Sequence, residues 1–331
     1  MNKYLSNIII ILLLGLFLAV SYLYVPNSVY ILNQKIEKSQ PLQQDEARQN
    51  LVSEYGQYLA KNLPENTPKL YFYWLSNQRK LSNIRVKQAI AEIKSEQVVS
   101  GKIKAWTLLN MGVVIKTNSK IIAIDTANLP FSQAHNELAR ITDVFLVTHL
   151  DGDHFDSSLL KKAIANNKKV VLPEGFLFDS SQSENIIKLN SGESRNINGV
   201  TITAYQTDHR GDGNFNDPSV WFKIKTDGFT LLHTGDGRDF KNKNEANKVY
   251  QAKDYDILLG NILLHPYNIR DLKPHLFIPL HLFKFMSGND LYQQSTIEVV
   301  QSNYQNYTKD LQGINIVYLL PGEGFTYPAE N

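Results

Sequence analysis

Short apolar segments separated by turn residues fill the chain from about residue 103 onward, and this pattern limits the fold more than any other feature of the sequence. Each segment has the length of a strand, and helix-like stretches such as FSQAHNELAR and SSLLKKAIANN lie between some of them. Strands that alternate with helices predict an α/β protein built from stacked layers. Several of the apolar segments end on a histidine or an aspartate, and functional sites are commonly built at such positions.

The composition excludes several classes of protein. Hydrophobic residues make up 43% and charged residues 20% of the 331 residues, which is typical of globular rather than disordered chains. The formal net charge is only +2, so no overall positive field indicates nucleic acid as a partner. Because the chain has no cysteine, disulfide scaffolds, thiolate metal sites and cysteine nucleophiles are excluded.

An uncharged apolar run extends from Ile8 to Val25. At about 1.5 Å per residue it would span about 27 Å, close to the thickness of the hydrocarbon core of a bilayer. We therefore predict an uncleaved transmembrane helix, with a cleaved signal peptide as the alternative. Lys3 precedes the run and the next lysine is Lys35. The positive-inside rule then predicts a single-pass protein of a bacterial-type inner membrane, with a cytoplasmic N-terminus and a periplasmic or extracellular catalytic domain.

Residues 27–102 are predicted to form a stalk and an N-terminal helical extension between the anchor, residues 1–26, and the body, residues 103–331. The stretch DEARQNLVSEYGQYLAKNL repeats apolar residues at helical spacing. The residues expected on one face of this short amphipathic helix are Leu51, Tyr55, Tyr58, Leu59 and Leu63. We expect this face to pack on the body or on the membrane surface. A second helix is predicted around NIRVKQAIAEIKSE.

The segment after the apolar run Val144–Val147 concentrates groups that bind metal ions. Four potential ligands fall within six residues of the stretch THLDGDHFD, and they are His149, Asp151, Asp153 and His154. Neighbouring residues of a helix point in different directions, so a turn is the structure in which Asp153 and His154 can both face one point. The density of these ligands favours two metal ions over one.

This segment resembles the H-x-H-x-D-H signature of the metallo-β-lactamase fold superfamily, and the resemblance covers about residues 103–331. His209 after VTITAYQ, Asp236 in LLHTGD and His281 in LKPHLFIPLH follow in the order of the family's third histidine, metal-bridging aspartate and final histidine. The strand KIIAIDTA, which contains Asp125, is also similar to the family. The resemblance implies an α/β fold of four layers, an αββα sandwich.

The resemblance also implies a ligand set for two divalent metal ions. One ion would be held by His149, Asp151 and His209, a second by Asp153, His154 and His281, and Asp236 would bridge them. Asp153 and Asp236 are the residues expected to take part in catalysis. Because two such ions produce a bridging hydroxide near neutral pH and polarise a carbonyl or phosphoryl group, the implied reaction is hydrolysis.

Asp151 departs from the signature, which has a second histidine at this position. The variant resembles the Asp-containing signature of the metallo-β-lactamase-like domains in bacterial DNA-uptake competence proteins. The rest of the body looks more like the group that contains ascorbate-phosphate lactonases and N-acyl-phosphatidylethanolamine phospholipase D. A carboxylate is a harder donor than an imidazole, so the metals expected are zinc first, with manganese or iron as alternatives.

Other polar residues leave alternatives open at the site. Asp208 or Asp212 could replace His209 as a ligand. Asp125 and Asp156 are candidates to orient the ligating imidazoles, which usually donate their second ring N–H to a carboxylate or carbonyl. The histidines outside these motifs are His233, expected to line the pocket, and His135, His265 and His275, expected to be structural or exposed.

Together these features predict a membrane-anchored, dinuclear metal-dependent hydrolase of a phosphodiester, lactone or related ester bond. Its expected partners are a small-molecule or lipid-like ester substrate and, through the N-terminal helix, the membrane. One alternative is an extracytoplasmic nuclease that resembles the competence-type domains. The other is a non-catalytic binding module whose site has degenerated at Asp151, because a fold does not by itself imply a function.

Overall fold

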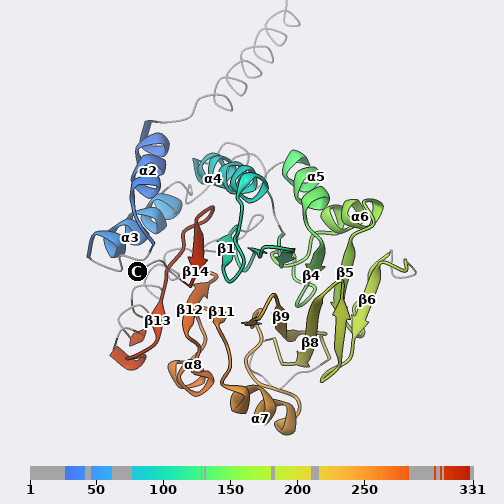
Figure 1. Cartoon of the computed structure of the whole chain (residues 1–331). Helices are drawn as coiled ribbons and strands as arrows, with labels where there is room; N and C mark the ends of the chain where they lie inside the picture. The colour runs from blue at the N-terminus through green and yellow to red at the C-terminus, as the bar shows by residue number, and fades with distance from the viewer. Residues whose placement is uncertain are drawn as a thin grey trace, which may run out of the picture.

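Two seven-stranded sheets form the centre of the protein (Figure 1). The structure is a computed structural model that describes residues 27–41, 46–61, 77–127, 129, 132–179, 183–209, 216–282, 302, 306–307 and 309–328. In sheet order, the first sheet contains β14 (Gly324–Tyr327), β1 (Ile103–Thr107), β2 (Val113–Lys116), β3 (Ile121–Ile124), β4 (Val144–Leu146), β5 (Lys169–Pro173) and β6 (Ile186–Leu189). The second contains β13 (Asn315–Ile316), β12 (Leu276–Leu280), β11 (Ile257–Asn261), β10 (Phe229–His233), β9 (Val220–Thr226), β8 (Val200–Gln206) and β7 (Ser194–Ile197).

Each sheet combines an antiparallel part with a parallel part. In the first sheet β14, β1, β2 and β3 pair antiparallel, whereas β3 to β6 pair parallel. In the second sheet β7 to β10 pair antiparallel, whereas β10 to β13 pair parallel. The parallel strands require crossover connections, and helices provide several of these along the chain.

The alternation of side chains along the strands produces the layers. In β2, Val113 and Ile115 belong to the apolar cluster between the sheets, whereas Val114 belongs to the cluster under the helices. In β11, Leu259 likewise faces the other sheet and Leu258 faces the helices. Both faces of these strands are therefore buried, which explains why the segments read as continuous apolar runs.

Helices cover the outer face of each sheet. α5 (Ser132–Ile141) and α6 (Ser157–Ala165) lie on one side of the molecule, and α7 (Lys243–Ala252) and α8 (Pro266–Leu272) lie at the opposite side (Figure 1). Apolar residues on their inner faces, such as Leu138 and Ile269, are fully buried. The layered two-sheet α/β architecture expected from the sequence is confirmed.

The residues predicted to form the stalk and extension contain three helices, α2 (Asn27–Lys38), α3 (Glu46–Lys61) and α4 (Asn77–Ser95). Leu51 and Tyr55 are buried, as the helical pattern predicts. The side chain of Leu59, and Leu63 as a whole, lie outside the described residues. Buried side chains of α2, α3 and α4 join the same apolar cluster as β1 and α5, so these helices pack on the body.

The predicted membrane placement requires correction. Within the ranges that the structure describes, no helix combines the length and apolar character needed to cross a membrane. The run from Ile8 to Val25, on which the prediction depended, lies outside these ranges. This finding overturns the predicted single-pass placement in a bacterial-type inner membrane, and we withdraw the assignment of a cytoplasmic N-terminus and a periplasmic or extracellular catalytic domain.

The fold places the predicted ligands at the ends of strands from both sheets. β4 ends at Leu146, just before the segment rich in ligands, and β8, β10 and β12 end shortly before His209, Asp236 and His281. Two of these strands, β10 and β12, pair parallel with β11 between them, so their carboxyl ends lie at the same edge of the second sheet. The segments that follow can therefore converge on one site.

Phe222 offers a test of the core between the sheets, because it lies in β9 and is fully buried there. We expect Phe222→Ala to lower the free energy of unfolding by about 3–5 kcal/mol through lost burial and the cavity left behind. Lys225→Ala on the same strand, whose ammonium group is exposed, should change it by less than about 0.5 kcal/mol. Equilibrium unfolding in urea measures the free energy of unfolding of both variants. Equal decreases in the two variants would contradict the assignment of Phe222 to the core.

Candidate metal centre

The ligand-rich segment forms a tight turn between β4 and α6. The backbone N–H groups of His154 and Phe155 both donate to the carbonyl oxygen of Asp151, at 2.9 Å each. The carboxylate of Asp156 accepts the N–H of Leu159 at 3.0 Å and thereby caps α6. Asp156 also lies 3.2 Å from His135, so it supports the helix and contacts a histidine away from the predicted ligands. The sequence indicates Asp156 as a candidate to orient a ligating imidazole, but the histidine that its carboxylate contacts is His135, which is not a predicted ligand.

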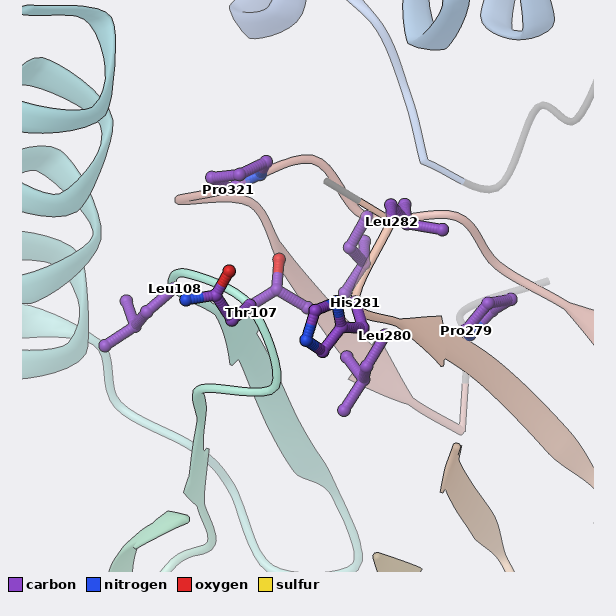
Figure 2. A pocket seen from close by; sticks show the side chains of 9 residues that line it. Thr107, Leu108, Pro279, Leu280, His281, Leu282 and Pro321 are labelled. Carbon is purple, nitrogen blue, oxygen red and sulfur yellow. The ribbon is translucent and has the colours of Figure 1, made fainter. Parts of the chain in front are cut away.

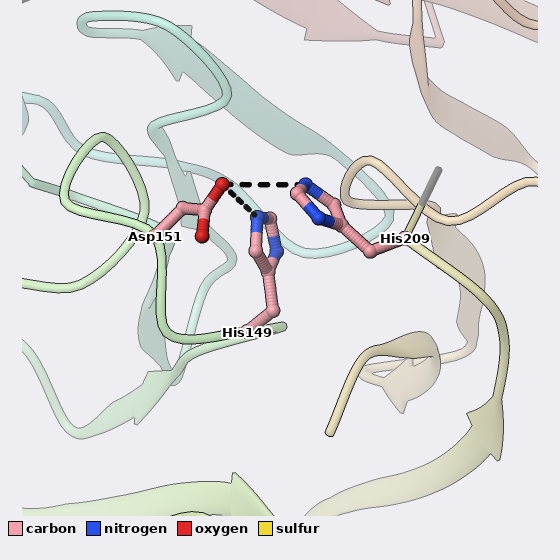
Figure 3. A group of neighbouring side chains, drawn as sticks. All are labelled: His149, Asp151 and His209. Carbon is pink, nitrogen blue, oxygen red and sulfur yellow. Dashed lines mark ion pairs between the residues drawn. The ribbon is translucent and has the colours of Figure 1, made fainter. Parts of the chain in front are cut away.

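His149, Asp151 and His209 form the first group of neighbouring side chains, with ligand atoms within 4.8 Å of one another (Figure 3). Oδ2 of Asp151 lies 3.4 Å from Nε2 of His209 and 3.9 Å from Nε2 of His149. His149 is buried, whereas 52% of the Asp151 side chain is exposed. Asp151, the residue that departs from the signature, therefore points its carboxylate at both histidines from the solvent side.

Asp153, His154 and His281 form the second group. Nε2 of His281 lies 3.2 Å from Oδ2 of Asp153, and Nε2 of His154 lies 4.0 Å from the same oxygen. The rings of His149 and His154 have centroids only 3.9 Å apart, so the two groups adjoin. The structure thus brings together six of the seven predicted ligands in two neighbouring sets.

Asp236 lies between the two sets. Its Oδ2 is 3.4 Å from Nε2 of His154 in one set and 3.7 Å from Nε2 of His209 in the other. The preceding residue, Gly235, has a φ of +50°, and a Cβ atom there would lie 2.6 Å from Oγ1 of Thr148. Only glycine fits this close approach, which explains why a glycine precedes the aspartate.

The second oxygen of Asp236 is oriented by a residue that the sequence did not indicate. Nδ2 of Asn261, at the end of β11, donates to Oδ1 of Asp236 at 2.7 Å. This bond leaves Oδ2 of Asp236 directed at the two imidazoles. A single asparagine after an apolar strand carries no motif, so the order of residues alone could not reveal this role.

A fully buried carboxylate, Asp125, orients the ligand-rich segment. Its Oδ1 accepts the backbone N–H of Thr148 at 2.8 Å, and its Oδ2 accepts the Thr148 hydroxyl at 2.6 Å. Nδ1 of His154 donates to the same Oδ2 at 2.9 Å. The sequence prediction that Asp125 orients a ligating imidazole agrees with this geometry.

These contacts fix the tautomers of two histidines. The hydroxyl proton of Thr148 is used by Asp125, so the 3.0 Å contact between Thr148 Oγ1 and His149 Nδ1 has the imidazole as donor. His149 and His154 therefore both carry a proton on Nδ1. Their Nε2 atoms are buried and lack a hydrogen-bond partner among the described residues. Buried ring nitrogens that face carboxylates and have no hydrogen-bond partner there fit the needs of a divalent cation.

The electrostatics of the site agree with this interpretation. Burial, with the nearby charge of His154, lowers the pKa of His149 to about 3. Burial would also lower the pKa of His154, but the carboxylates of Asp236 and Asp125 raise it well above its ordinary value. Burial would raise the pKa of Asp153, but the hydrogen bond from His281 and the charge of His154 lower it to about 2. The carboxylates hold their negative charge, and a cation would replace the proton that they attract to His154.

The alternatives to His209 are not supported within the described residues. The Asp208 carboxylate is buried and accepts the N–H of Asp239 at 3.0 Å, and no candidate metal group includes it. Asp212 lies outside the described residues. His233 is fully buried, with its Nδ1 accepting the N–H of Gly235 at 3.2 Å, so it holds the turn before Asp236 rather than lining an open pocket.

The comparison with known families supports the resemblance. Residues 110–262 match the model of the family described as "Beta-lactamase superfamily domain". The matched range includes six of the seven predicted ligands, and His281 follows beyond it.

Two curated relatives from archaea are similar to this chain. One is "UPF0173 metal-dependent hydrolase TK0141" from Thermococcus kodakarensis, 27% identical over 150 residues, which is 42% of this chain and 66% of the relative. The other is "UPF0173 metal-dependent hydrolase PYRAB05000" from Pyrococcus abyssi, 27% identical over 176 residues, which is 49% of this chain and 77% of the relative. The match therefore spans slightly less than two thirds of the first relative.

Solved structures share the fold. A metallo hydrolase from Ignicoccus hospitalis, Igni18, aligns with a TM-score of 0.52 at 17% identity and covers 69% of this chain and all of its own. CmlA, a diiron β-hydroxylase from Streptomyces venezuelae, aligns with a TM-score of 0.50 at 12% identity over 70% of this chain and 55% of its own. At these identities the likeness establishes the architecture alone.

The role of Asp125 can be tested by Asp125→Asn. The amide keeps the shape of the side chain but replaces one acceptor oxygen by an NH₂ group, which faces either the Thr148 donors or the His154 N–H. We expect metal affinity to fall by about 10–100-fold, as for other residues that orient ligands. Competition against a chromophoric chelator measures the metal affinity. Asp254→Asn, which changes an exposed carboxylate that pairs with Lys223, is the control, and equal affinities in both variants would contradict the role.

Proposed function

We propose that this protein, whose body belongs to the metallo-β-lactamase superfamily of metal-dependent hydrolases, uses two divalent metal ions to cleave a phosphodiester, lactone or related ester bond. The observation that carries the proposal is the pair of buried Nε2 atoms on His149 and His154, each directed at carboxylates and without a hydrogen-bond partner in the described part of the chain. The names of the two archaeal relatives support the reaction class.

Each set of ligands would hold one ion. His149, Asp151 and His209 form the first set, Asp153, His154 and His281 form the second, and Asp236 reaches both. When bound, such ions supply a nucleophile of lowered pKa and polarise the scissile group. The carboxylates of Asp151, Asp153 and Asp236 bring a formal charge of −3, which offsets most of the +4 charge of two divalent ions. Neutral imidazoles complete the sets without adding positive charge.

The chain's own residues provide orientation and proton handling around the ions. Asp125 fixes the ring of His154, and Asn261 fixes the carboxylate of Asp236. Asp153 and Asp236 line the centre, so they are the groups placed to hold a proton during the reaction. Because Asp151 lies on the exposed side, we propose that the substrate approaches from there.

The nature of the metal depends on Asp151. A carboxylate favours harder ions than an imidazole does, so we propose zinc as the usual occupant, with manganese or iron accepted at the first set more readily than in a site with a second histidine. The 3.4 Å distance between Asp151 Oδ2 and His209 Nε2 supports its role as a ligand.

Asp151 variants test this assignment. Asp151→Ala should lose the ion of the first set, because the variant removes a charged ligand. Asp151→His should retain two ions and shift the preference toward zinc. The measurement is metal stoichiometry by elemental analysis after equilibration of wild type and variants with mixed zinc and manganese at one fixed pH. Equal stoichiometry and equal zinc-to-manganese ratios in all three proteins would remove Asp151 from the ligand set.

The reaction class is tested with chromogenic phosphodiester, lactone, thioester and β-lactam substrates after the metal content has been measured. We expect turnover of a phosphodiester or a carboxylic ester, and loss of it after treatment with a chelator. Cleavage of single-stranded DNA with added manganese would instead support the nuclease alternative suggested by Asp151. A protein that binds no metal would refute the proposal.

Asp236→Ala should abolish turnover while the fold is retained, because this carboxylate reaches both sets and lies in a turn rather than in the core. Activity assays and circular dichroism measure the two effects. Asp239→Ala changes an exposed carboxylate three residues further along and should leave turnover within about twofold of wild type. Near-normal activity of Asp236→Ala with two bound ions would refute the bridging role.

A further inference from the structure

A buried arginine joins the N-terminal helices to the end of the chain. Arg48 in α3 is only 2% exposed, and its guanidinium contacts both carboxylate oxygens of Glu323, with Nη1 to Oε1 at 2.9 Å. Nη1 also donates to Oγ of Ser39 at 2.7 Å, and Nη2 donates to the carbonyl of Tyr318 at 2.6 Å. Such a bidentate pair in the interior fixes the position of both partners.

The chain around Glu323 forms a turn, residues 318–323, that is tied to the end of β1. The Glu323 carboxylate accepts the N–H of Leu320 at 2.7 Å. Oγ1 of Thr107 donates to the carbonyl of Leu320 at 2.9 Å, and the N–H of Gly322 donates to the carbonyl of Thr107 at 2.8 Å. Arg48 is thus connected to Thr107 through a short chain of buried hydrogen bonds.

Thr107 begins a second turn, residues 107–112, which touches the metal centre. The carbonyl of Asn110 accepts the N–H of His281 at 3.1 Å, and the carbonyl of Met111 accepts from Nε2 of His233 at 3.2 Å. Figure 2 shows His281 next to Thr107, in a pocket that is also lined by Leu108 and by Pro321 of the other turn. Residues of both turns therefore line the same pocket as His281.

His281 depends on such support because its backbone is strained. Its φ is +61°, a left-handed conformation that costs energy in a residue with a side chain. The bond from its N–H to Asn110 is a contact that stabilises this conformation. The same conformation directs Nε2 at Asp153.

We propose that Arg48 is a positioning residue for His281, so that α3 sets the affinity of the second set of ligands, Asp153, His154 and His281, for its ion. This inference rests on the two-metal assignment in the proposed function. Loss of the guanidinium leaves Glu323 buried without its partner, which loosens residues 318–323 and, through Thr107 and Asn110, the backbone of His281.

The test compares Arg48→Met with wild type, with Arg48→Lys and with Lys35→Met. The last breaks the exposed pair between Lys35 and Glu54 on the same helices and serves as the control. Zinc binding is measured by chelator competition on the full chain at one pH, together with thermal unfolding of the metal-free proteins. We expect Arg48→Met to bind one zinc normally and the other at least about 10-fold more weakly. Arg48→Lys should restore part of the affinity, because lysine keeps the charge but not the two-pronged contact.

His281→Ala identifies which ion is affected. We expect it to bind a single zinc, and the variant that combines it with Arg48→Met should bind that zinc with the same affinity. Normal affinity for both ions in Arg48→Met, even with a lower melting temperature, would refute the proposal, as would weaker binding of the remaining zinc in the combined variant. If Arg48→Met does not fold, the zinc affinities of Arg48→Lys are used instead. Weaker binding of one zinc by Arg48→Lys would then support the proposal, and normal binding of both would refute it. A wild type that binds fewer than two zinc ions would refute the two-metal assignment first, and this inference with it.

Discussion

The hydrogen bonds of the buried Asp125 carboxylate are the interactions on which the candidate metal centre depends. A charge in the interior is tolerated only when donors surround it, and here the Thr148 N–H, the Thr148 hydroxyl and the His154 ring provide them. These bonds fix the start of the ligand-rich segment to the end of β3. They also leave the hydroxyl of Thr148 as an acceptor for His149, so one carboxylate determines which ring nitrogen of both histidines faces the site.

The site is formed where the two sheets meet, and its ligands come from both. His149, Asp153 and His154 follow a strand of the first sheet, whereas His209 and Asp236 follow strands of the second. The distances between these groups are therefore set by the packing of apolar side chains between the sheets. A change in that packing moves one half of the site against the other, so the stability of the core and the geometry of the centre are linked.

The sequence predicted the layered fold, and the seven residues that it proposed as ligands lie close together, because strand-end histidines and aspartates in a fixed order form a strong pattern. It did not indicate Asn261, Asn110 or Arg48, because each acts through contacts with residues far away in the chain; Arg48 and Glu323 are 275 positions apart. The helix with Leu51 and Tyr55 on one face was expected to pack on the body or on the membrane surface, and both side chains are buried in the apolar cluster of the body. The membrane placement failed because it depended on one apolar run, which lies outside the described residues, and found no support in the helices that are described.

The two sets of ligands differ in how firmly the protein holds them. Asp153 and His154 are buried, and their neighbours fix them by hydrogen bonds, as Asp125 does for His154. Asp151 is half exposed, and water screens its attraction to a cation more strongly than it screens that of a buried carboxylate. In the proposed two-metal centre, rigid protein geometry would therefore be the main influence on the choice of ion in the second set. In the first set the main influence would be the chemical nature of the Asp151 oxygen, which is the position that departs from the family signature.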